Sequence, residues 1–232
     1  MTRLGALLTA FLITLAAPAT AQERPVLVEL YTSQGCSSCP PADAFLHKLA
    51  ARGDVIALAL HVDYWDYIGW KDNFARPEYT ARQRGYAKVA NRRMVYTPQM
   101  IINGADHVVG TRPMDVTDLI RKHHGAAARV ALSVVERPGR LEIDATAATG
   151  AAGTATVRLF RYLPQETVAI KRGENAGKSV SYTHIVTDMD VVADWDMRQP
   201  LDIDVPLDGD LPAVVVIQRN SFGPVEAVAK ID

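Results

Sequence analysis

Apolar and polar positions in the first half of the chain alternate between strand-like and helix-like patterns. Two largely apolar runs, 26–31 and 55–62, have the length of strands buried on both faces. Between them, apolar residues recur at helical spacing over 42–50. The run 100–102 leads into Asn103-Gly104, a turn dipeptide that predicts a hairpin into 108–109. Two further helices are expected, over 78–91 and from Pro113 to Gly125. This order predicts an α/β domain over residues 22–127.

The pattern changes after Arg129. Short alternating runs follow one another, with turn residues such as Pro138-Gly139 between them. The runs cover 132–135, 141–145, 156–160, 167–170, 201–205 and 214–217. Strands at this spacing predict an antiparallel, sandwich-like all-β domain over residues 128–232.

The first 21 residues have the pattern of a secretory signal peptide. Arg3 precedes an uncharged, mostly apolar run over 4–17, and Ala19-Thr20-Ala21 is a small-x-small cleavage site. A retained membrane anchor is the weaker interpretation, because the run is short and no basic cluster follows it. We therefore predict cleavage after Ala21, no membrane span in the mature chain, and a periplasmic or secreted protein.

The net charge of the chain limits the classes of binding partner that we expect. The 232 residues include 25 Lys and Arg against 26 Asp and Glu, a formal net charge of −1 without basic runs. Nucleic acids and anionic membrane surfaces are therefore not expected partners.

The two cysteines, Cys36 and Cys39, are separated by two residues. A disulfide scaffold would space more cysteines widely, whereas a bond between these two closes a very short loop and constrains the unfolded chain little. A structural zinc site is also a poor fit, because no second Cys or His pair at ligand spacing accompanies them. Redox chemistry is the favoured interpretation, and a static disulfide or metal clip is the alternative.

The position of the pair supports redox chemistry. The motif follows a predicted strand and precedes a helix, so that Cys36 lies near a helix N-terminus that favours the thiolate. Cys39 is close enough to resolve a mixed disulfide formed at Cys36. Pro40 and Pro41 suit the first helical turn.

The strand 26–31, the C-x-x-C motif and Thr97-Pro98 before a strand together resemble the thioredoxin superfamily. The resemblance implies a thioredoxin-like first domain and a cis bond before Pro98. It also implies that Thr97 and Pro98 bind the substrate backbone next to the dithiol. Thioredoxin itself has Gly-Pro between its cysteines, whereas this chain has Ser37-Ser38, which leaves the direction of the redox chemistry open.

A longer set of motifs resembles the exported bacterial proteins of the DUF1223 family. The matching segments are 29–43, 61–66, 69–70, 95–100 and 173–177. The resemblance covers nearly the whole mature chain and implies no particular substrate.

Glu29 resembles the buried acid that thioredoxin uses as a proton relay. Buried among apolar neighbours, its carboxylate would have a raised pKa and could act as a base. A hydrogen-bonded or exposed edge glutamate is the alternative interpretation.

Polar and aromatic residues gather at the end of the second predicted strand: His61, Asp63, Trp65, Asp66 and Trp70. Because strand C-termini border the ligand crevice of an open α/β sheet, Asp63 and Trp65 are candidates for substrate binding. His61 with Cys36 and Cys39 would suit a soft metal such as Cu(I), although a buried, hydrogen-bonded histidine is the commoner case.

Three functions follow from the sequence. The first is a thiol-disulfide oxidoreductase that needs no cofactor beyond the Cys36–Cys39 disulfide, in which Cys36 attacks and Cys39 resolves. Its partners would be protein or small thiol and disulfide substrates and an unidentified redox partner. The second is a metal-binding or metallochaperone module that uses the same cysteines. The third is an interaction protein in which the C-terminal β domain carries the function and the dithiol is vestigial.

Overall fold

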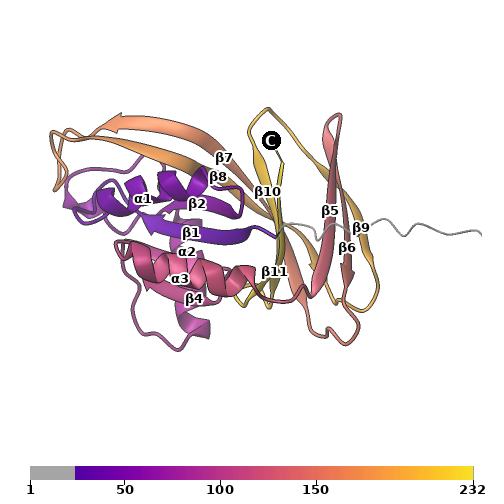
Figure 1. The fold of residues 1–232 in the computed structure, drawn as a ribbon. Helices are drawn as coiled ribbons and strands as arrows, with labels where there is room; N and C mark the ends of the chain where they lie inside the picture. The colour runs from indigo at the N-terminus through magenta and orange to yellow at the C-terminus, as the bar shows by residue number, and fades with distance from the viewer. Residues whose placement is uncertain (1–23, 232) are drawn as a thin grey trace, which may run out of the picture.

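The computed structural model describes residues 24–231, so the predicted signal peptide lies outside the described residues. Within that range the chain forms eleven strands, three α-helices and one short 3-10 helix (Figure 1). The helices are α1 (Pro40–Ala50), η1 (Asp66–Ile68), α2 (Pro77–Val89) and α3 (Pro113–His124). The strands are β1 (Val26–Thr32), β2 (Val55–His61), β3 (Gln99–Ile102), β4 (Asp106–Val109), β5 (Val130–Arg137), β6 (Arg140–Ala147), β7 (Ala155–Ala169), β8 (Ser179–Trp195), β9 (Leu201–Pro206), β10 (Ala213–Arg219) and β11 (Val225–Ile231).

The fold is mostly β, and one mixed eight-stranded sheet dominates it. Its strand order is β11-β10-β7-β8-β2-β1-β3-β4, and a second sheet has the order β5-β6-β9. The prediction of a thioredoxin-like α/β domain followed by a separate sandwich-like domain is therefore wrong. Strands from both halves of the chain share one sheet, and β8 pairs with β2 at Ile185 and Ala59. The division at residues 127 and 128 stays a prediction.

The central strands are buried on both faces, which explains their nearly continuous apolar runs. Val26, Val28 and Leu30 of β1 face the layer that holds α1 and α3. Leu27 and Tyr31 face the opposite layer, which holds α2 and side chains from β7 and β10. Because side chains alternate along a strand, each position in β1 and β2 is assigned to one of the two layers.

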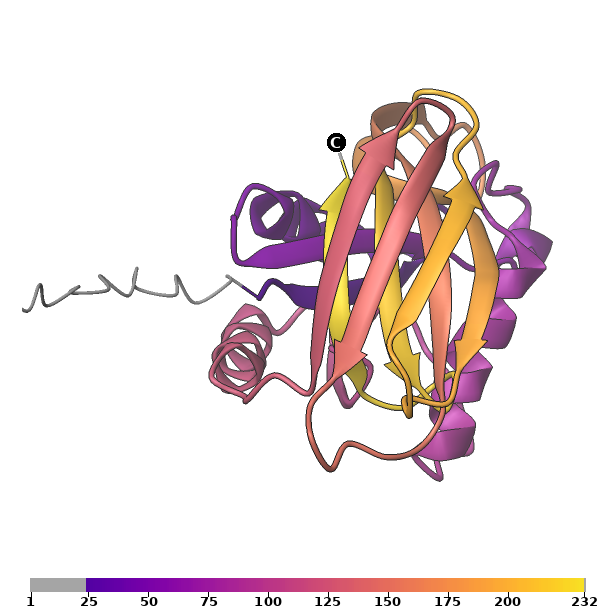
Figure 2. The same cartoon turned by 90° about the vertical axis from the view of Figure 1, so that its right-hand side faces the viewer.

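The three-stranded sheet lies across the other end of the large sheet, against β7, β10 and β11 (Figure 2). Its alternate residues, such as Leu141 and Ile143, are buried in the core between the two sheets. This packing explains the alternating pattern of β5 and β6.

β7 and β8 form a long hairpin that extends past the rest of the sheet over α1 (Figure 1). Its outer part pairs from Gln165 with Thr183 to Ala169 with Ser179. The hairpin brings the loop 170–178 next to the segment that follows β1, as the hydrogen bonds of Asn175 to Gln34 and Cys36 show. No helix among residues 24–231 is long and apolar enough to cross a membrane.

Candidate functional site

Cys36 and Cys39 form a disulfide at the beginning of α1, as predicted. Their Cα atoms are 5.4 Å apart, and Cys39 directly precedes the helix, whose first turn contains Pro40 and Pro41. Both cysteines are buried, with 1% and 0% of their surface exposed. Ser37 and Ser38 between them are exposed, and the Ser38 hydroxyl lies 3.5 Å from Cys36 Sγ. The disulfide is therefore covered by a turn of two solvent-facing serines.

We call residues 35–39 the dithiol turn. Trp65 connects this turn to the segment before β3. Its indole N–H donates a hydrogen bond of 2.8 Å to the Thr97 hydroxyl. A Cβ atom on Gly35, the residue before Cys36, would lie 3.2 Å from Trp65 Cβ. The Thr97–Pro98 peptide bond is cis, and the structure thus brings Gly35, Trp65 and Thr97 together.

The loop between β7 and β8, which includes the family motif 173–177, lies over the dithiol turn. The buried Asn175 side chain donates hydrogen bonds of 2.9 Å to the backbone carbonyls of Gln34 and Cys36. The Glu174 carboxylate accepts a hydrogen bond from the Ser37 amide at 3.3 Å. No spacing signal could have found Asn175, because it lies 139 positions from Cys36.

A buried acid on α1, Asp43, belongs to the family motif 29–43 but was not predicted as a site residue. Asp43 Oδ1 accepts a 2.8 Å hydrogen bond from the Thr32 hydroxyl, while Oδ2 is buried without a hydrogen-bond partner. Burial raises the pKa of Asp43 to about 7, although the charge of His61 and the bond from Thr32 partly oppose this shift. An aspartate at the beginning of a helix is usually an exposed capping residue, so its position alone gives no sign of burial.

His61 lies in the same layer and is completely buried. Its Nδ1 is 2.7 Å from Asp72 Oδ2, which also accepts a hydrogen bond from the Gln34 amide, and its Nε2 has no hydrogen-bond partner. Burial alone would lower the pKa of His61, but the Asp72 carboxylate outweighs it and raises that pKa. Burial likewise opposes ionisation of Asp72, yet His61 and backbone amides lower its pKa. The pair is therefore stabilised as an imidazolium and a carboxylate.

Asp63 and Glu29, two other candidates from the sequence, are bound elsewhere. Asp63 accepts a 2.5 Å hydrogen bond from Thr80 of α2. Glu29 faces the layer opposite α1 and is held by Arg82 at 2.6 Å and by the Tyr86 hydroxyl at 2.5 Å. The role of Asp63 in substrate binding and that of Glu29 in proton transfer stay predictions. Glu29 also has a structural role, because it is the buried ion-pair partner of Arg82.

A metal site is not assembled from the predicted ligands. Cys36 and Cys39 are joined to each other, and His61 is bound to Asp72. Among the described residues, no three His, Cys, Asp or Glu side chains gather as ligands of one ion. The metal hypothesis stays a prediction without support from these contacts.

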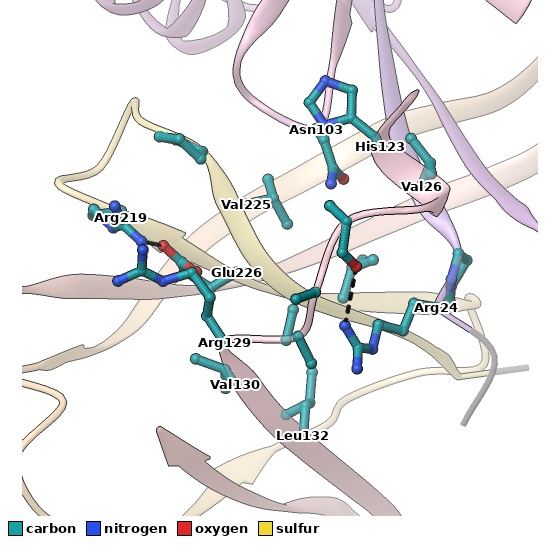
Figure 3. A pocket seen from close by; sticks show the side chains of 17 residues that line it. Arg24, Val26, Asn103, His123, Arg129, Val130, Leu132, Arg219, Val225 and Glu226 are labelled. Atoms are coloured by element: carbon teal, nitrogen blue, oxygen red, sulfur yellow. Dashed lines mark hydrogen bonds and ion pairs between the residues drawn. The ribbon is translucent and has the colours of Figure 1, made fainter. Parts of the chain in front are cut away.

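A cavity of about 280 Å³ lies at the other end of β1, between α3, β5 and β11 (Figure 3). Glu226 is bound there by Arg129 and Arg219, and Arg24 donates a hydrogen bond to the Ala126 carbonyl. Because these charged groups bind one another or the backbone, the cavity presents no chemistry comparable to the dithiol.

A family model and two solved structures are similar to this chain. The model of the family described as "Protein of unknown function (DUF1223)" matches residues 27–218. The crystal structure of protein AGR_C_4864 from Agrobacterium tumefaciens has 36% sequence identity and a TM-score of 0.77, covering 91% of this chain and 96% of that one. HBP35 of Porphyromonas gingivalis has a similar fold, with 13% identity and a TM-score of 0.61 over 90% of this chain and 75% of that one. No curated protein matches the chain.

Proposed function

The chain belongs to the DUF1223 family, and we propose that it is an exported protein that exchanges thiols and disulfides through Cys36 and Cys39. One observation carries the proposal: the disulfide closes a loop with a sequence separation of 3 at the beginning of a helix. So short a loop restricts the unfolded chain less than a long one, which makes stabilisation a poor reason for the bond. A reactive role in thiol-disulfide exchange explains the presence of the bond better.

The surroundings of the pair suit this chemistry. In the reduced protein, the dipole of α1 favours a thiolate near the N-terminus of the helix. The Ser38 hydroxyl, 3.5 Å from Cys36 Sγ, can donate a hydrogen bond to that thiolate. Cys36 is followed by the two exposed serines, and we propose that it is the sulfur that substrates attack or that attacks them.

Trp65 lies against Gly35 and donates a hydrogen bond to Thr97, and we propose that both side chains contact the substrate. Export rests on the sequence of residues 1–21, and an oxidising compartment is where such a disulfide persists. The substrate class is a protein or small-molecule thiol or disulfide.

Cys36→Ser and Cys39→Ser test this proposal as a matched pair, because each variant removes the same disulfide. We expect Cys36→Ser to lose exchange with oxidised glutathione, and Cys39→Ser to accumulate a mixed disulfide at Cys36, detected by mass spectrometry. A purely structural disulfide would make the two variants equivalent. Equal behaviour, without a trapped adduct in either variant, would therefore overturn the proposal.

A further inference from the structure

Cys39 is completely buried, and this creates a problem for the proposed exchange reaction. To attack a mixed disulfide at Cys36, the Cys39 thiol must first lose a proton. Solvent does not reach its sulfur, so the proton needs an acceptor within the protein. Any such acceptor has to lie in the layer that contains α1.

The alternation of β1 decides which carboxylate is available. Glu29 faces the α2 layer, where Arg82 and Tyr86 bind both of its oxygens. Thr32, three residues later, faces the opposite layer, and its hydroxyl donates a hydrogen bond to Asp43 of α1. The sheet therefore lies between Glu29 and α1, the helix that begins after Cys39. Asp43 is part of α1 and lies on the same side of the sheet as Cys39.

Asp43 lies one helical turn after Cys39, and its amide donates a 3.1 Å hydrogen bond to the Cys39 carbonyl. Residues four apart on a helix have Cβ atoms about 5–6 Å from each other. The carboxylate also has a free acceptor, because Oδ2 is buried without a partner. Asp43 is thus a neighbour of Cys39 with an unused lone pair.

His61 brings a second unpartnered atom into this layer. It is the strand neighbour of Thr32 in the pairing of β1 with β2, and paired residues point to the same face. Its Nδ1 is bound to Asp72, which leaves Nε2 without a partner. The charged and titratable groups around Asp43 are therefore His61 from β2, Asp72 from the segment before α2, and Tyr182 from β8.

We propose that Asp43 accepts the proton of Cys39 when the mixed disulfide is resolved, with the charge of the buried His61 side chain balancing that of the carboxylate. The Cys39 S–H bond breaks and the Asp43 O–H bond forms. The Cys39 thiolate then attacks Cys36 Sγ, the Cys36–Cys39 bond forms, and the substrate leaves as a thiolate that takes a proton from water. The dithiol is oxidised and the substrate disulfide is reduced, and in the reverse direction Asp43 returns the proton to Cys39. This inference rests on the proposed exchange function.

A nitroaromatic disulfide whose thiol product absorbs visible light separates the two steps. Attack by Cys36 releases the first aromatic thiolate, and resolution by Cys39 releases the second. In the reduced full chain carrying Asp43→Asn, we expect the first phase to be unchanged and the second to slow by at least about tenfold at pH 7. The second phase of the unsubstituted protein should accelerate with pH through an inflection that the variant lacks. Asp115→Asn, an exposed aspartate in the first turn of α3, is the matched control.

The outcomes separate this inference from the proposed function. If the unsubstituted protein releases no aromatic thiolate, the exchange function itself fails. If both phases occur and Asp43→Asn keeps the rate and pH profile of the second phase, the role of Asp43 is overturned and the function stands.

Thr32→Val tests the same idea in a chain that keeps Asp43, in case Asp43→Asn does not fold. The hydroxyl of Thr32 stabilises the Asp43 carboxylate, so its loss should move the inflection of the second phase to higher pH. An unmoved inflection would contradict the assignment.

Discussion

Asn175 and Cys36, 139 positions apart in the chain, are joined by a 2.9 Å hydrogen bond from the Asn175 carboxamide to the Cys36 carbonyl. The same amide nitrogen binds the Gln34 carbonyl. The tip of the β7–β8 hairpin therefore fixes the backbone on which the dithiol is built.

Replacing Asn175 by Asp keeps the size of the side chain but removes the donor. Two backbone carbonyls lose a buried partner, so we expect a loss of about 1–3 kcal/mol in the free energy of unfolding, together with slower exchange. Urea unfolding of the oxidised protein and the glutathione exchange rate measure both effects. Asn220→Asp is the control, because the exposed Asn220 side chain accepts a hydrogen bond from Thr154 and an aspartate can do the same. Equal stability of the two variants would refute this role of Asn175.

Glu29→Gln distinguishes a structural from a catalytic role for Glu29. The substitution leaves the buried Arg82 guanidinium without its carboxylate, which should cost about 3–5 kcal/mol of stability. Because Glu29 faces away from α1, the exchange rate of the folded fraction should not change. A variant of normal stability that has lost exchange would instead support Glu29 as the base.

Two glycines with positive φ in turns allow a test of how the halves of the chain pack. A Cβ on Gly104 would lie 2.4 Å from the Gly223 carbonyl oxygen, whereas one on Gly139 would meet open space. Both alanine variants carry the cost of positive φ, about 1–2 kcal/mol. We expect Gly104→Ala to be less stable than Gly139→Ala by a further 1–3 kcal/mol or so, because of overpacking. Similar unfolding midpoints for the two variants would argue against the close approach of the two turns.

The burial of Asp43 makes the stability of the protein depend on pH. Its pKa is about 7 in the folded chain and about 3.9 for an unperturbed aspartate. Between these values the folded chain holds a proton that the unfolded chain lacks, so Asp43 lowers stability as the pH rises. Asp43→Asn removes this dependence, and its stability relative to the unsubstituted protein should increase from pH 4 to about pH 7. Urea unfolding across this range checks the sign, and a constant difference would exclude a raised pKa.

The sequence predicted local features of the site well. Gly35, Cys36, Cys39 and the prolines of α1 lie within a few positions of one another, and their strand-turn-helix pattern depends on local propensity. The hairpin at Asn103-Gly104 was predicted correctly for the same reason, since both residues adopt positive φ.

Features that depend on distant pairing were missed. An apolar run indicates a strand but not its neighbour, and β8 was not predicted. Its pairing with β2 through Ile185 and Ala59 is what merges the two predicted domains into one sheet. Glu29 was proposed as a base because its environment could not be assigned before Arg82 was known to face it. Asp43 and Asn175 were overlooked because their burial arises only in the folded chain.

A redox titration of the full chain determines whether Cys36 and Cys39 form a reversible dithiol. The protein is equilibrated in glutathione buffers of defined ratio, its thiols are alkylated, and the oxidised fraction is measured by mass spectrometry. We predict a reversible two-electron transition with a midpoint above about −300 mV, the region below which structural disulfides typically lie. A pair that stays oxidised in every buffer, including excess reduced glutathione, would show that the disulfide is structural and that the proposed exchange does not occur.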